Sequence, residues 1–243
     1  MSENSVTFEL VDGVHTISLN RPDKLNALTA EMFRTLDHLL DTQLADAACL
    51  HLRANGRSFC AGHDLDDLAE SESYEVERFA TGLVERLACL PMPVVASVQG
   101  HCFTGGLELV LAADIIIAAE TAEFADTHSK WDLVPIWGLT QRLPRRIGTS
   151  KAMEMMFAGR RYRGPEARNM GLANHCVPDA ELESFAKELC GAILVNSQRS
   201  NRAIKKLLLD TEGMQLSQGI AWELHRFEGH GPDFLARLAA MRK

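Results

Sequence analysis

The sequence of 243 residues contains no apolar run long enough to span a bilayer, which argues against a membrane-spanning helix. Residues 1–8 are polar and lack both the basic start and the apolar block of a secretory signal. Basic residues are in the minority, since 25 Lys and Arg face 33 Asp and Glu and the net charge is −8. This balance argues against a general nucleic-acid binder, which needs a basic surface. We therefore expect a cytoplasmic protein that binds neither nucleic acid nor membrane.

The 6 cysteines also lack the spacing of a metal or redox site. No two of them form a CxxC pair, and none stands at a metal-ligand distance in sequence from a histidine. We interpret them as free thiols in a reducing cytosol, most of them buried. The sequence contains no P-loop pattern either, so nothing indicates nucleoside triphosphate chemistry. Neither a metal nor a resident cofactor is expected.

One stretch, residues 93–118, carries the densest signal in the chain. Gly105 and Gly106 stand where a helix is predicted to begin, and glycine lets a ligand approach the backbone closely. The first amides of a helix lack intrahelical partners and lie at its positive end. Glu108 follows one turn later, which predicts a carboxylate beside an amide donor; a Gly-rich turn with a solvated Glu108 is the alternative. The stretch PVVASVQGHCFTGGLELVLAADIIIA predicts strand, helix and strand over 94–98, 107–113 and 115–119.

The first 178 residues alternate between strand and helix patterns, which predicts an α/β fold. Asp12 and Gly13 join two alternating apolar runs and predict a hairpin. Residues 66–74 are acidic and predict a surface loop, and residues 75–90 predict an amphipathic helix that Pro91 stops.

After Asp179 the sequence pattern is helical only. We therefore divide the chain into an α/β core, residues 1–195, and a C-terminal helical segment, residues 196–243. The helical runs beyond Asp179 cover 181–194, 199–210, 216–227 and 233–241.

Five segments of the chain together resemble one known family. FCAGHDL (59–65) and GHCFTGGLELVLAAD (100–114) resemble the two signature segments of the crotonase family, the enoyl-CoA hydratases and isomerases. The resemblance implies a spiral of ββα units whose C-terminal helical segment helps to form a homotrimer, or a hexamer of two trimers. No internal repeat shows the spiral independently. The other similar segments, in the usual order, are RPDKLNA (21–27), PIWGLTQRLP (135–144) and residues 159–171.

The resemblance also implies a chemistry. The family acts on acyl-CoA thioesters, and a negative charge develops on the thioester oxygen during the reaction. The backbone N–H groups of His63 and Gly105 match the family's oxyanion hole, which is the largest single aid to such a reaction. Glu108 matches the first of the two glutamates of a typical hydratase and is the expected acid/base group.

The second glutamate is missing, because His128 stands in its place. A histidine there could orient water or relay a proton, or it could be a packed or solvent-facing ring. We retain it as a second catalytic candidate. Asp126 and Asp132 flank it and could substitute, but we interpret them as helix-cap and surface residues.

Coenzyme A is part of the substrate and brings phosphates and an adenine. The resemblance assigns substrate contacts to Lys24, Ala61, Asp64 and Leu65, and the acyl pocket to Trp131, Ile136 and Trp137. The alternative for Lys24 is a solvated lysine, and the alternative for the pocket residues is ordinary core packing.

The sequence therefore predicts an acyl-CoA-active enzyme of hydratase-like lyase type. An isomerase, hydrolase or decarboxylase is the alternative within the enzyme class, because these share the oxyanion hole and differ in the proton-transfer residues. A non-catalytic acyl-CoA-binding paralogue is the alternative outside it. The direction of the His128 ring distinguishes the two classes. A ring that points into the pocket favours the enzyme, and a ring that packs away from it favours the binding protein.

Overall fold

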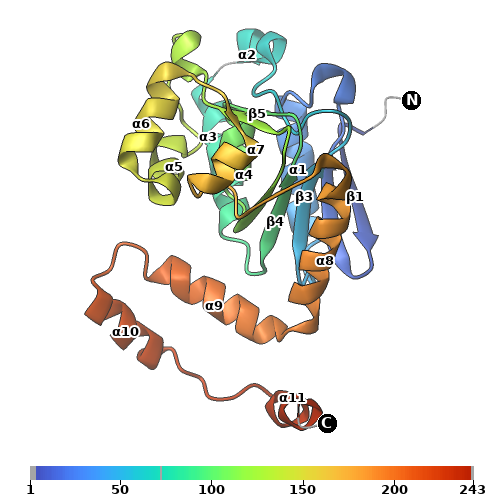
Figure 1. Ribbon diagram of the computed structural model, residues 1–243, viewed down its shortest axis with the longest axis vertical. Helices are drawn as coiled ribbons and strands as arrows, with labels where there is room; N and C mark the ends of the chain where they lie inside the picture. Colours follow the sequence, from blue (N-terminus) through green and yellow to red (C-terminus); the bar gives the residue numbers. More distant parts are fainter. Residues whose placement is uncertain (1–3, 72, 242–243) are drawn as a thin grey trace.

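Two β-sheets organise the computed structural model, which describes residues 4–71 and 73–241. Within those residues the larger sheet has the order β1-β2-β3-β4-β6-β9, and only its β1–β2 pair is antiparallel. The smaller sheet has the order β5-β7-β8 (Figure 1). The strands of the larger sheet are β1 (Val6–Val11), β2 (Val14–Leu19), β3 (Leu50–Ala54), β4 (Val94–Val98), β6 (Ile115–Ala119) and β9 (His175–Val177). Those of the smaller sheet are β5 (His101–Phe103), β7 (Glu123–Ala125) and β8 (Tyr162–Arg163).

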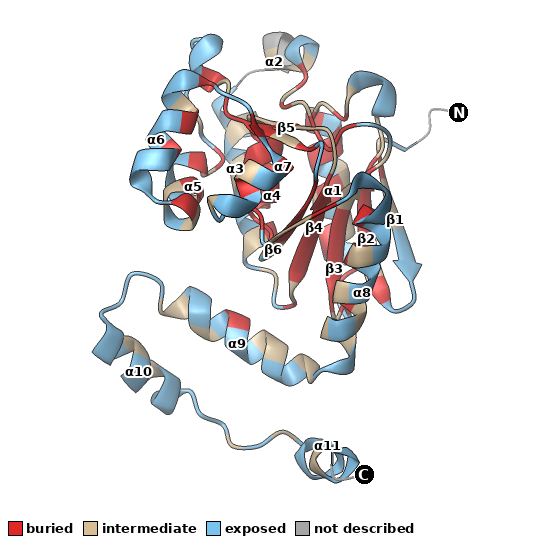
Figure 2. Cartoon of the chain, in the orientation of Figure 1, coloured by how far each residue is buried: buried red, intermediate tan, exposed pale blue. Residues whose placement is uncertain are grey.

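Helices cover and connect the strands, and buried residues concentrate in the central strands and α4 (Figure 2). Side-chain caps start several helices: Thr29 accepts from the Met32 N–H before α1, and Ser73 accepts from the Val76 N–H before α3. The α-helices are α1 (Ala30–Thr42), α2 (Leu65–Ser71), α3 (Tyr74–Ala88), α4 (Gly105–Val110), α5 (Leu139–Ile147), α6 (Thr149–Ala158), α7 (Gly164–Asn169), α8 (Leu182–Val195), α9 (Gln198–Asp210), α10 (Leu216–His225) and α11 (Phe234–Ala240). Short 3₁₀ helices are η1 (Pro22–Lys24), η2 (His128–Lys130) and η3 (Asp179–Glu181).

The parallel pairing of β3 with β4 places the loops that follow them at one edge of the sheet. All five residues of β4 are buried, as a parallel strand covered on both faces requires. Isolated backbone β-bridges tie the loop after β3 to two other segments. One pairs Cys60 with Cys102 of β5, both of them free thiols, and the other pairs His63 with Leu28 of the N-terminal loop. The two segments with the strongest sequence signal therefore meet.

The predicted surface loop at residues 66–74 is wrong, because α2 occupies Leu65–Ser71; residue 72 lies outside the described residues. The Asp64 carboxylate accepts hydrogen bonds from the N–H groups of Asp66 and Asp67, and this capping starts the helix. The central helix α4 is also shorter than predicted. Ala113 bonds to the carbonyl three residues earlier, which closes the helix in a tight turn before β6.

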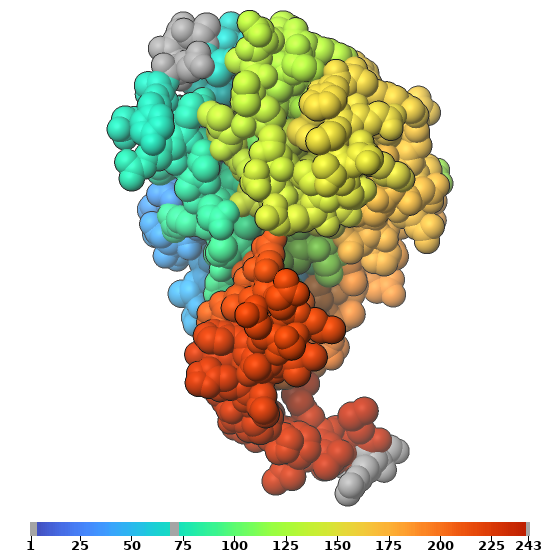
Figure 3. All heavy atoms as spheres, turned by 90° about the vertical axis from the view of Figure 1, so that its left-hand side faces the viewer, coloured from blue at the N-terminus to red at the C-terminus, as the bar shows by residue number. Residues whose placement is uncertain are grey.

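The C-terminal helices α9 to α11 extend away from the sheets, whereas α8 packs on β2, β4 and β6 (Figures 1 and 3). The boundary predicted between residues 195 and 196 falls at the end of α8 and stays a prediction. Helix α9 is anchored by Lys205, a buried lysine whose Nζ lies 2.8 Å from Asp114 Oδ2 and 3.2 Å from the Met92 carbonyl oxygen. None of the described helices is both long and apolar enough to cross a bilayer.

A polar pair is buried in the larger sheet. His51 Nε2 on β3 lies 2.8 Å from Ser97 Oγ on β4, and both side chains are nearly inaccessible to solvent. Burial, followed by the charge of Arg53, lowers the pKa of His51 to about 4. The folded protein therefore holds this ring neutral at neutral pH.

We predict that His51 makes the stability of the fold sensitive to acid. Because its pKa is lower in the folded state than in the unfolded state, its contribution is complete above about pH 6.5 and is lost as the pH falls toward 4. The difference in free energy of unfolding between wild type and His51→Gln should shrink by about 3 kcal/mol between pH 7 and pH 4. Urea titrations at several pH values measure it, with His38→Gln on the exposed face of α1 as the control substitution. A pH-independent difference would contradict the prediction.

Candidate active site

A cavity of 320 Å³ opens where the loop after β3 and the start of α4 meet the segment before α5. It brings together six of the residues that the sequence singled out, from four separate segments of the chain. Those six are His63, Gly105, Glu108, His128, Ile136 and Trp137, and the remaining lining residues are Leu68, Glu77, Thr104, Asp132, Leu133 and Val134.

Two backbone N–H groups at this cavity have no partner among the described residues. Leu28 bonds to the residues on both sides of His63, through the Gly62 carbonyl and the Asp64 N–H, so the His63 N–H is directed away from that strand. The Gly105 N–H is the first of α4 and has no intrahelical acceptor.

Glycine is required where these two turns approach each other. Gly62 has a φ of 113°, and a Cβ built on it would lie 3.9 Å from the Gly105 nitrogen. A Cβ on Gly105 would lie 2.5 Å from the Trp137 ring. A side chain at position 62 would therefore strain the backbone at this positive φ, whereas one at position 105 would displace the indole.

Glu108 is held in the apolar helix α4 with only 2% of its surface exposed. Its Oε1 accepts hydrogen bonds from the N–H groups of Trp137 at 2.9 Å and Leu139 at 3.2 Å. Burial raises the pKa of Glu108 to about 7, against the lowering effect of His128 and of these two N–H groups. Burial therefore outweighs every local group that favours the ionised form. A solvated Glu108, the alternative left open by the sequence, is wrong.

His128 points into the cavity and toward Glu108, with 3.7 Å between its Nε2 and Glu108 Oε2. On its other side Nδ1 lies 2.5 Å from Asp126 Oδ1, which also accepts from the His128 N–H at 3.2 Å. Asp126 is 1% exposed, so its interpretation as a surface residue is wrong, although its carboxylate does accept the first N–H of η2. The D-x-H spacing directly after a short strand was the signal that could have revealed the pair. Asp132 is exposed and lies at the cavity wall.

Trp137 forms one wall of the cavity. Its ring packs against the rings of Phe33 and His63, at centroid distances of 4.9 and 5.4 Å. Its Nε1–H donates to Glu77 Oε2 on α3 at 2.8 Å, a contact that the sequence did not suggest because 60 residues separate the two. The indole is thus fixed at both ends and limits the space next to Gly105.

The remaining candidates lie outside the cavity lining. Trp131 does not line the cavity. It follows the last residue of η2, and 58% of its surface is exposed to solvent. Asp64 forms an ion pair with Arg21 at 2.9 Å in addition to starting α2, so its carboxylate already has partners. Ala61 donates its N–H to the Leu25 carbonyl. Lys24 is exposed at the end of η1, and Leu65 is exposed at the start of α2.

Comparisons with known proteins agree with the sequence signatures and with this geometry. A family model described as enoyl-CoA hydratase/isomerase matches residues 9–231. The chain belongs to the enoyl-CoA hydratase/isomerase family. The predicted crotonase resemblance, the crotonase fold and the prediction of an enzyme of this family are therefore confirmed.

Relatives of this family align with nearly the whole chain. The Arabidopsis thaliana protein named probable enoyl-CoA hydratase 1, peroxisomal, is 33% identical and covers 95% of this chain and 87% of its own length. An enoyl-CoA hydratase from Bacillus anthracis has a TM-score of 0.93 at 32% identity, with 98% and 96% covered. A putative enoyl-CoA hydratase from Thermobifida fusca, solved with acetoacetyl-CoA, has a TM-score of 0.85 at 26% identity, with 97% and 95% covered.

We predict that Glu108 destabilises the folded protein at alkaline pH. A carboxyl group whose pKa is raised by folding contributes stability below its unfolded pKa of 4.5, and this contribution is lost as the pH rises through about 7. Glu108→Gln should therefore gain about 3 kcal/mol in free energy of unfolding relative to wild type between pH 4 and pH 8. Denaturant titrations at both pH values test this. A relative stability that does not change with pH would contradict it.

Proposed function

We propose that the protein is an acyl-CoA-active enzyme of the enoyl-CoA hydratase-like lyase type. The observation that carries this proposal is the common cavity of two unpartnered backbone N–H groups and a buried carboxylate with a pKa of about 7. Family membership and the acetoacetyl-CoA bound to the Thermobifida fusca relative support a thioester ligand.

The N–H groups of His63 and Gly105 form the proposed oxyanion hole. Two backbone donors directed at the thioester oxygen stabilise the enolate that forms when the acyl chain gains a nucleophile or loses a proton. A Cβ built on Gly62 would lie 3.9 Å from the Gly105 nitrogen, so the residue before His63 lies close to the second donor, which supports this role.

Glu108 is the proposed principal acid/base group. A carboxyl group whose pKa lies near the working pH can both take up and release a proton. The two N–H groups at Oε1 leave Oε2 to face the cavity and His128. Glu108 therefore takes the proton of the water that adds to the acyl chain.

The coenzyme A moiety is proposed to lie along the loops of Lys24 and Ala61. Lys24 is exposed on η1 and can meet a phosphate as a point charge. Leu65 is 56% exposed at the start of α2 and offers an apolar contact for the pantetheine arm. Trp137 and Ile136 bound the acyl pocket, and the fixed indole favours a short acyl group.

The direction of His128 favours an enzyme over a non-catalytic binding paralogue. A ring packed away from the cavity would have left Glu108 without a second proton-transfer group beside it. Instead, His128 Nε2 lies 3.7 Å from Glu108 Oε2. Isomerase, hydrolase and decarboxylase activities remain candidates within the enzyme class, because they use the same oxyanion hole.

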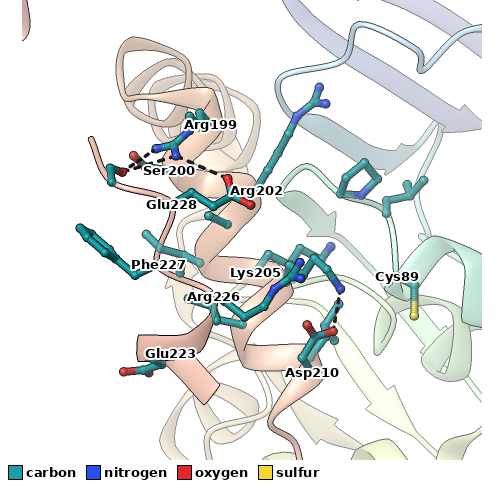
Figure 4. Close-up of a pocket in the computed structure, with 18 residues that line it drawn as sticks. Cys89, Arg199, Ser200, Arg202, Lys205, Asp210, Glu223, Arg226, Phe227 and Glu228 are labelled. Atoms are coloured by element: carbon teal, nitrogen blue, oxygen red, sulfur yellow. Dashed lines mark hydrogen bonds and ion pairs between the residues drawn. The ribbon is translucent and has the colours of Figure 1, made fainter. Parts of the chain in front are cut away.

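We propose that copies of the chain assemble through the C-terminal helices, as a homotrimer or a hexamer of two trimers in the cytoplasm. Apolar side chains of α9 and α10 are exposed in one chain, among them Leu224 at 78%. A second cavity of 780 Å³ lies between α9, α10 and the turn at Cys89, with Phe227 and Arg226 at its edge (Figure 4). Covering these surfaces by association would bury apolar area that a single chain leaves in water.

We predict that Glu108→Gln lowers kcat by about a hundredfold or more while thioester binding stays nearly intact. The amide keeps the shape of the carboxyl group and an oxygen for the two N–H donors, but it cannot accept the proton. Product analysis over 2-enoyl-, 3-enoyl- and 3-hydroxyacyl-CoA identifies the substrate, and calorimetry with acetoacetyl-CoA measures binding. Equal turnover of wild type and variant would overturn the role of Glu108, and absence of any thioester binding by folded protein would overturn the proposed function.

We predict that the wild type sediments as a trimer or hexamer at micromolar concentration. Leu224→Glu should shift it toward the monomer, because a charge would be buried in the contact between copies. Leu10→Glu on β1 is the matched control, a leucine that is 60% exposed and lies outside the C-terminal helices. A wild type that is only monomeric would contradict the prediction.

A further inference from the structure

Asp126 is a buried carboxylate whose hydrogen bonds, within residues 4–71 and 73–241, both go to one residue. Asp126 follows β7 directly in the chain. Its Oδ1 accepts both the side-chain Nδ1–H and the backbone N–H of His128. With 1% of its surface exposed it has no role at the protein surface. A buried carboxylate costs folding free energy unless it is paired, so its presence needs an explanation in the site.

The hydrogen bond at Nδ1 determines what the other ring nitrogen can do. An ionised carboxylate only accepts, so Nδ1 must carry a proton, and a neutral ring then has its lone pair on Nε2. Nε2 is the atom that faces Glu108 and the cavity. The distance of 3.7 Å is too long for a good direct hydrogen bond and leaves both groups available to a ligand.

The backbone beside the ring is held as well. The Thr127 N–H donates to Thr104 Oγ1 at 3.2 Å, and the two threonine hydroxyl groups are 2.6 Å apart. Thr104 immediately precedes Gly105, so the segment of His128 is tied to the turn that carries the proposed oxyanion donor. Asp126 and Thr104 thus hold the segment from both sides.

We propose that Asp126 is a positioning residue that fixes the tautomer and the direction of His128, so that Nε2 acts with Glu108 on the acyl chain. This inference rests on the proposed function of the same cavity. As water adds, its oxygen bonds to one acyl carbon and its proton passes to Glu108. Before this step Nε2, which carries a lone pair in the neutral ring, takes up the proton of the neighbouring Glu108 carboxyl group. The Nε2–H of the resulting imidazolium then goes to the neighbouring acyl carbon. The proton on Glu108 then returns to Nε2, so atoms and charge balance over one turnover.

Asp126 is the carboxyl group nearest to the His128 ring, with 2.5 Å between its Oδ1 and Nδ1. Glu108 is the other carboxylate in contact, at 3.7 Å. On α6, which packs against η2, the Glu154 carboxylate accepts from the Tyr162 hydroxyl group instead. The other titratable side chains that line the cavity are His63, Glu77 and Asp132.

A double-mutant cycle tests whether Asp126 acts through His128. Asp126→Ala and His128→Ala should each lower kcat by about a hundredfold with little change in KM, and the double variant should lose no more than either single variant. Glu123→Gln is the control, because it removes another carboxylate from β7 that pairs with Arg161 outside the cavity. Additive losses in the double variant would overturn the inference.

The ring tautomer provides a second test that needs no substrate. Nitrogen NMR at high pH should show the proton of His128 on Nδ1 in the wild type, and a shift of population to Nε2–H in Asp126→Ala. Asp126→Asn should keep the wild-type tautomer, because the backbone N–H of His128 holds the amide oxygen in place beside Nδ1. This variant is the one to measure if Asp126→Ala does not fold. An unchanged tautomer in folded Asp126→Ala would overturn the inference. Because acetoacetyl-CoA binding tests the proposed function separately, the two can fail independently.

Discussion

The cavity depends on the hydrogen bonds that two backbone N–H groups, those of Trp137 and Leu139, make to the buried carboxylate of Glu108. They join α4 to a segment 29 and 31 residues further along the chain. The same segment carries the indole that packs over Gly105 and His63. One buried acid therefore connects the proposed proton transfer, the wall of the pocket and the proposed oxyanion donors.

Holding this acid in an apolar helix opposes stability. Burial raises the pKa of Glu108 to about 7, so the folded state is penalised when the group ionises. The burial of the surrounding branched and aromatic side chains offsets the free-energy cost of placing Glu108 in the core. Burial in the sheet likewise disfavours the charged form of His51, which does not line the cavity. Buried ionisable groups are thus placed at two sites for different reasons.

The parts that could be predicted from the sequence are those with local causes. The hairpin at Asp12 and Gly13 and the strand β4 followed from turn chemistry and β-branched runs. The paired glycine segments led to the family and so to the crotonase fold. Strands β5 and β8 were missed, because two or three residues carry no periodicity and are extended only through their partners in the smaller sheet.

By itself the sequence determined which residue types are present and which turns need glycine, because these depend on local backbone geometry. It also placed Glu108 one turn after Gly105. Only the tertiary structure decided that burial prevails over the N–H donors in setting the pKa of Glu108, and that Asp126 is buried against His128 while Trp131 is exposed. These outcomes depend on how much water each group loses when distant segments pack together, a quantity that no short stretch of sequence contains.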